Sequence, residues 1–170
     1  MKLTKKLTNI LILVGVILGG IGIDQLTKIL VSKNMALYES IPVIPKVFNI
    51  TYIQNRGAAF GMLSDKIYVV LPITVVVIGI CIFIYLKNKG ESKIFDYAML
   101  LIVTGAIGNV MDKLTRGFVV DFLNFEFMDF PVFNVADISV CTGAGLLIIY
   151  ILFCSDKKKE AEGKADDTDM

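Results

Sequence analysis

Four aspartates lie in or beside apolar stretches, where a charge is costly: Asp24, Asp112, Asp121 and Asp137. An ionisable side chain inside a membrane span costs about 2.5–3.5 kcal/mol on insertion scales, and such side chains usually face the bundle interior and mark function. The sequence contains no histidine. This excludes Ser-His-Asp and Cys-His catalysis and histidine-ligated zinc. Acid–base chemistry near neutral pH must then use carboxylates, lysine, tyrosine or cysteine.

Asp121 and Asp137 form a candidate acid pair. Asp121 follows the third of four long apolar stretches, and Asp137 opens the fourth, with Asn134 as a possible helix N-cap. If both stretches span a membrane, the two aspartates lie on the same side at a similar depth. Two neighbouring carboxylates cannot both ionise easily, so one could activate water while the other, protonated, polarises a carbonyl. Spacing leaves Asp112 an equally plausible member of the pair.

Two further polar groups have helical spacing. Asp24 and Lys28 are four residues apart and share a helix face. They either neutralise each other near the interface, with Lys28 snorkelling outward, or they position an active-site loop. Asn109 and Asp112, three residues apart, also share a face, which must point inward because a buried amide and carboxylate need partners. Gly108 would let a neighbouring helix approach closely there.

The composition indicates the elements that carry these residues. Of 170 residues, 55% are hydrophobic and only 19% are charged, whereas about 25% are charged in a soluble domain. A hydrocarbon core about 30 Å thick needs roughly 20 helical residues. We therefore predict an all-α membrane protein with a four-transmembrane-helix bundle in a single domain, 1–154, with spans at about 10–31, 67–86, 94–114 and 131–154.

Lysines predict the orientation of these spans. They cluster in segments 2–6, 87–93 and 157–159, which lie on one side of a four-span protein. By the positive-inside rule that side is cytoplasmic, so both termini face inward. Basic residues in the loop 32–66 weaken this contrast. The first span resembles the start of a signal peptide, but Asp24 stands where cleavage would be expected, so we expect a retained helix.

Two segments then face outward. In the loop 32–66, the run 47–53 favours a short strand or hairpin at the membrane surface. Segment 115–131 is rich in phenylalanine, and we expect its rings to lie in the interface. The charged tail 155–170 is expected to be cytoplasmic and disordered.

The cysteines and the basic residues suggest no other chemistry. Cys81, Cys141 and Cys154 lie in apolar stretches without a CxxC motif, and small buried side chains are the simplest interpretation. No basic stripe with interleaved aromatic residues indicates nucleic-acid binding.

Five short motifs occur in the order found in the bacterial lipoprotein signal peptidases (signal peptidase II), and the chain resembles this family from about residue 10 to 154. The motifs are Asp24 to Lys28, Asn55 to Gly61, Gly105 to Asp112, Val119 to Phe122 and Phe133 to Asp137. The resemblance implies an aspartyl endopeptidase of the bacterial cytoplasmic membrane that works without a metal or cofactor. It implies cleavage of prolipoproteins just before a diacylglyceryl-modified cysteine, inhibition by globomycin, and a small extracytoplasmic β-cradle beside the bundle.

The resemblance also implies residue roles, with the active site near the outer membrane face. It selects Asp121 over Asp112 as the catalytic partner of Asp137. Supporting residues that contact substrate or hold the site would be Asp24, Lys28, Asn55, Gly57, Gly108, Asn109, Asp112, Lys113, Asn134 and Ala136. The family usually has arginine where this chain has Lys113, and lysine keeps the charge but lacks the planar, bidentate fork.

Three other functions stay open on sequence grounds. Buried acids could form a proton or cation relay in a small transporter or channel subunit, although these acids cluster toward one membrane face. The polar helix ends could instead serve contacts in a non-catalytic assembly factor. A serine–lysine protease using Ser64 and Lys66 is a weaker alternative, because nothing else in the sequence supports it.

Overall fold

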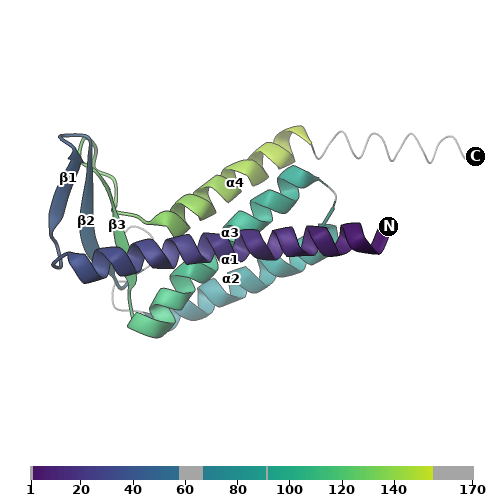
Figure 1. The fold of residues 1–170 in the computed structure, drawn as a ribbon, viewed down its shortest axis with the longest axis horizontal. Helices are drawn as coiled ribbons and strands as arrows, with labels where there is room; N and C mark the ends of the chain where they lie inside the picture. The colour runs from purple at the N-terminus through teal and green to yellow at the C-terminus, as the bar shows by residue number, and fades with distance from the viewer. Residues whose placement is uncertain (1, 58–66, 91, 155–170) are drawn as a thin grey trace, which may run out of the picture.

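Four helices and a small sheet make up the part of the chain that the computed structural model describes, residues 2–57, 67–90 and 92–154 (Figure 1). The helices are α1 (Lys2–Asn34), α2 (Ile67–Asn88), α3 (Lys93–Arg116) and α4 (Val135–Phe153). Within these described residues, all four helices are long and apolar enough to cross a membrane. The predicted four-span bundle is therefore confirmed. The tail 155–170, and the Ser64 and Lys66 of the weakest alternative, lie outside the described residues.

The helix ends follow local capping signals. The side chain of Ser92 accepts a hydrogen bond from the Ile94 N–H and opens α3. Gly117 ends α3 in the left-handed region at φ 77°, which glycine adopts without steric cost. The fourth helix begins at Val135, four residues later than the predicted span, because Asn134 caps it. Phe133, just before this cap, forms an isolated β-bridge with Leu123 instead.

Helix α3 is the most buried of the four, and it packs against α1, α2 and α4. Glycine permits the closest approaches to α4. A Cβ built on Gly143 would lie 2.6 Å from the Ala98 carbonyl oxygen, and one on Gly105 would collide with the Ala136 carbonyl oxygen. Large apolar side chains elsewhere on the helices, such as Leu18, Val76 and Leu152, are exposed. These outward apolar faces suit a lipid environment.

The sheet has three antiparallel strands in the order β1 (Ser40–Ile44), β2 (Phe48–Asn55) and β3 (Val119–Phe125). The sequence predicted the β1–β2 hairpin region but not β3. Val120 and Phe122 of β3 are buried with Tyr52, and Val31 in the last turn of α1 and Met35 just after it pack against them. The expectation that the Phe122 ring lies in the membrane interface is therefore wrong, whereas Phe127 is exposed.

The sheet lies at one end of the bundle, beside the end of α1 and the start of α4 (Figure 1). The start of α1, the α2–α3 connection and the end of α4 lie at the opposite end (Figure 1). This is the arrangement that four successive spans require. It places β3, which follows α3, and the first turn of α4 at the same end of the molecule.

Candidate active site

Asn134 brings the two predicted catalytic aspartates together. Its side-chain amide donates to Asp121 Oδ1 at 2.6 Å, and its backbone N–H donates to Asp137 Oδ2 at 3.0 Å. The Asp137 N–H in turn donates to Asn134 Oδ1 at 3.0 Å, which completes a capping box at the start of α4. The predicted N-cap is confirmed. Asp137 therefore accepts the N–H of the cap residue with Oδ2, and its Oδ1 still faces the site.

Strand pairing fixes the position of Asp121. Asn55 is opposite Val119, and Ile53 is opposite Asp121, so Asn55 and Asp121 are diagonal neighbours on one face of the sheet. The Asn55 amide donates to Asp121 Oδ2 at 2.9 Å. The Gly57 N–H donates to Asn55 Oδ1 at 2.9 Å and orients that amide. Both oxygens of Asp121 thus accept hydrogen bonds from asparagine amides.

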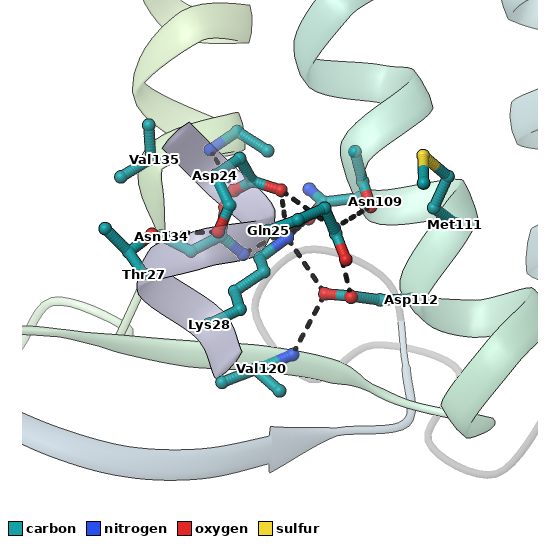
Figure 2. Close-up of polar contacts among 12 residues, drawn as sticks. Asp24, Gln25, Thr27, Lys28, Asn109, Met111, Asp112, Val120, Asn134 and Val135 are labelled. Carbon is teal, nitrogen blue, oxygen red and sulfur yellow. Dashed lines mark hydrogen bonds and ion pairs between the residues drawn. The ribbon is translucent and has the colours of Figure 1, made fainter. Parts of the chain in front are cut away.

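Figure 2 shows a buried ionic cluster around Lys28, Asp24 and Asp112, with Asn109 and Asn134 beside it. Lys28 Nζ is 2.8 Å from Asp24 Oδ2, 2.9 Å from Asp112 Oδ2 and 2.9 Å from Asn109 Oδ1. Lys28 and Asp112 are fully buried, and Asp24 is 2% exposed. The alternative in which Lys28 snorkels outward is therefore wrong. The inward direction predicted for Asn109 and Asp112 is confirmed, because both contact the buried ammonium.

Asp24 ties α1 to the other two helices of the site. Its Oδ1 accepts the Ala136 N–H of α4 at 2.9 Å. On α3, a Cβ built on Gly108 would lie 2.6 Å from Asp24 Oδ2. The predicted close approach at Gly108 is thus confirmed, and the neighbour that needs the space is a carboxylate.

Asn109 connects the ionic cluster to the aspartate pair. Its Oδ1 accepts from Lys28 and, at 3.2 Å, from the Asn134 amide, while its own amide donates to Asp137 Oδ1 at 2.8 Å. A neutral side chain therefore separates the lysine from the aspartate. This amide links Lys28 to the Asp137 side chain by hydrogen bonds, while Asp24 of the same cluster accepts the N–H of Ala136, the residue before Asp137.

Burial decides the ionisation of Asp121. The side chain is almost fully buried, and desolvation of its charged form, the largest effect, raises the pKa of Asp121 to about 7. The charge of Asp137 also raises this pKa, while the amides of Asn55 and Asn134 and the charge of Lys28 lower it. Near neutral pH, Asp121 is poised between its protonated and ionised forms.

Two contacts of Asp112 were not predicted from the sequence. Its Oδ1 accepts from Arg116 Nη1 at 2.8 Å and from the Gln25 amide at 3.2 Å. Arg116 is four residues after Asp112, and this spacing is the signal that could have revealed the pair. Lys113, in the same last turn of α3 as Arg116, interacts electrostatically with Asp121 and Asp137.

Four membrane-length helices and a buried acid pair at the sheet end define a class of protein: a multi-span membrane protein whose site can carry out carboxylate acid–base chemistry. A family model described as signal peptidase (SPase) II matches residues 16–153. The chain belongs to the signal peptidase II family and is a membrane peptidase.

Individual relatives agree with this assignment. A lipoprotein signal peptidase of Halothermothrix orenii is 47% identical over 129 residues, which cover 76% of this chain and 87% of the relative. A lipoprotein signal peptidase of Haemophilus influenzae is 44% identical over 143 residues, covering 81% of this chain and 82% of the relative. A solved bacterial membrane enzyme superposes with a TM-score of 0.81 at 34% identity, covering 87% of this chain and 92% of that one.

Proposed function

We propose that this chain is an aspartic endopeptidase that removes the signal peptide from lipid-modified prolipoproteins, with Asp121 and Asp137 as its catalytic residues. The family and the names of the relatives support the substrate class. One observation carries the choice of residues: a single residue, Asn134, hydrogen-bonds to both carboxyl groups. This leaves Asp112 in a supporting role, because its oxygens are occupied by Lys28 and Arg116.

The proposed chemistry divides the pair into an acid and a base. We assign the proton of the pair to Asp121, because burial raises its pKa to about 7 and a large share of the molecules is therefore protonated there near neutral pH. Asp137 takes a proton from water, whose oxygen attacks the scissile carbonyl carbon. Asp121 gives its proton to the carbonyl oxygen, which forms a gem-diol intermediate. This intermediate collapses when the protonated Asp137 transfers its proton to the departing amine and the ionised Asp121 takes a proton from a gem-diol hydroxyl, so both aspartates return to their starting forms. Cleavage falls just before the lipidated cysteine.

The substrate reaches this site from the bilayer in our proposal. Its signal peptide would enter sideways between helices, with the acyl chains of the modified cysteine left among membrane lipids. The asparagines near the pair would orient the peptide. The family supports a location in the bacterial cytoplasmic membrane, and the lysine distribution supports an orientation with both termini inside and the sheet end outside. Globomycin-type inhibitors are expected to occupy the same site.

The test compares three purified full-length variants on a lipid-modified precursor: Asp121→Asn, Asp137→Asn and Asp129→Asn. The first two should lose at least about 100-fold in rate, in line with removal of an acid–base group. Asp129 is an exposed acid in the loop after β3, so its variant is the matched control and should cleave at the wild-type rate. Near wild-type cleavage by either of the first two variants would overturn the assignment, and ion flux without cleavage would favour the transporter alternative.

A further inference from the structure

The buried cluster contains one more positive charge than the family motifs supply. Two carboxylates, Asp24 and Asp112, face a single motif cation, Lys28, and those three groups alone would carry a net charge of −1. Arg116 Nη1 lies 2.8 Å from Asp112 Oδ1 and makes the cluster neutral. Because buried charge without a counterion is expensive, this fourth group matters for the cluster as a whole.

The two oxygens of Asp112 have different partners. Oδ1 faces Arg116. Oδ2 faces Lys28 at 2.9 Å and the backbone N–H of Val120 at 3.4 Å (Figure 2). Val120 directly precedes Asp121 in β3. The Asp112 carboxylate therefore touches the backbone of the strand that carries the proposed acid. A group that fixes the rotation of this carboxylate also fixes that contact.

Arg116 is suited to this task by its place in the fold. Its side chain is 23% exposed while that of Asp112 is fully buried, so the guanidinium closes the outer side of the cluster. It lies in the last turn of α3, one residue before Gly117 turns the chain toward β3. From there it can hold Asp112 without entering the site.

We infer that Arg116 is a positioning residue of the peptidase: it neutralises the ionic cluster and holds the Asp112 carboxylate against the start of β3, so that Asp121 is correctly placed. The inference rests on the proposed function. It also assigns two roles to the two cations at the end of α3. Arg116 forms an ion pair with Asp112 of the cluster, whereas Lys113 interacts electrostatically with Asp121 and Asp137.

Because Arg116 is charged, its removal should change the pH dependence of the cleavage rate. The groups around Asp112 are Lys28 and Asp24 from α1 and Arg116 from α3. Those acting on Asp121 include Asp137 from α4, Lys28 from α1 and Lys113 from α3. Without Arg116 the cluster gains a net negative charge. The added negative charge raises the pKa values of the nearby catalytic pair. The acidic limb of the pH–rate profile, where the base ionises, and the alkaline limb, where the acid loses its proton, therefore both move to higher pH.

The experiment measures kcat and KM from pH 5 to 9 on a lipid-modified precursor, with full-length wild type, Arg116→Gln and Arg116→Lys. For Arg116→Gln we expect kcat to fall about tenfold or more with KM within about twofold, and both limbs to rise by roughly half a pH unit. Arg116→Lys keeps the charge and should leave the limbs in place. A role in α3 stability alone would lower the unfolding temperature without moving the limbs.

A double variant separates charge from packing. In Asp112→Asn/Arg116→Gln the cluster is again neutral, with Asp24 and Lys28 paired, so the limbs should return to their wild-type positions while kcat stays low. This variant carries the test if Arg116→Gln does not fold. Wild-type limbs and kcat in a folded Arg116→Gln, or displaced limbs in the double variant, would overturn the inference. Asp121→Asn, assayed in parallel, tests the proposed function independently.

Discussion

Gly108→Ala should damage the site through a single methyl group. The new Cβ would lie 2.6 Å from Asp24 Oδ2, 3.3 Å from Asp24 Cγ and 3.4 Å from the Ala136 Cβ. A Cβ atom essentially never lies within 3.0 Å of a heavy atom of another residue that is not its chain neighbour. Either the Asp24 carboxylate or α3 must therefore move. The carboxylate has little freedom, because Asp24 is held by Lys28 at 2.8 Å and by the Ala136 N–H at 2.9 Å.

The expected cost follows from this geometry. Overpacking a close-packed site costs about 1–3 kcal/mol, and the better helix propensity of alanine recovers at most about 1 kcal/mol. With the full helix-propensity gain, the net loss of stability is roughly 0–2 kcal/mol. The effect on the rate should be larger. Ala136 is adjacent to Asp137, and a displacement of about 1 Å at a catalytic group can cost about 100-fold.

The assay is cleavage of a lipid-modified precursor, with the unfolding temperature measured in the same detergent. Gly22→Ala is the matched control, because Gly22 lies on α1 near Asp24 and a Cβ there would meet nothing within 4 Å. The control should keep wild-type activity, and the Gly108 variant should lose at least about tenfold in rate. Equal activities of the two variants would refute the reasoning that this close approach positions the site.

Three further substitutions test other parts of the network. Lys28→Met should destabilise the protein by about 3–5 kcal/mol in denaturant unfolding, because it leaves two buried carboxylates without their shared cation; a loss below about 1 kcal/mol would contradict this. Asn134→Ser can still cap α4 but is too short to reach Asp121, so its unfolding temperature should stay near wild type while the rate falls about tenfold or more; an unchanged rate would count against the bridging role. Asn55→Ala removes a donor that favours the ionised form of Asp121, so the pKa of Asp121 should rise and the alkaline fall in rate should move up by about one pH unit; a downward move would contradict the sign.

Features that depend on local sequence were predictable. The four spans follow from apolar runs of membrane length, and their centres agree with the helices. The shared faces of Asp24 with Lys28 and of Asn109 with Asp112 follow from helical periodicity. The cap at Asn134 follows from residue type at a helix start. In each case, all the residues on which the prediction depends lie in a single helix or at its end.

Features that depend on contact between elements were not predictable in this way. Segment 119–125 is a strand because it pairs with β2, about 70 residues earlier in the chain. The inward direction of Lys28 depends on Asp112, which lies on another helix. Spacing also could not choose between Asp112 and Asp121, since both lie near the end of α3. Our proposal of Asp121 rests on contacts between elements, those of Asn134 with Asp121 and of Arg116 with Asp112.

The division between charged and neutral contacts explains how such a site can work inside a membrane protein. Lys28 is buried among carboxylates, and within the described residues its hydrogen bonds lead to Asp137 through the neutral amide of Asn109. The other hydrogen-bond donors to the pair that the described residues provide are Asn55 and Asn134, which are neutral as well. A lysine in direct contact would favour two ionised carboxylates and leave no acid. In the mechanism that we propose, the amides hold the two aspartates in place while the pair keeps a shared proton, and the neutral ionic cluster holds Asn109.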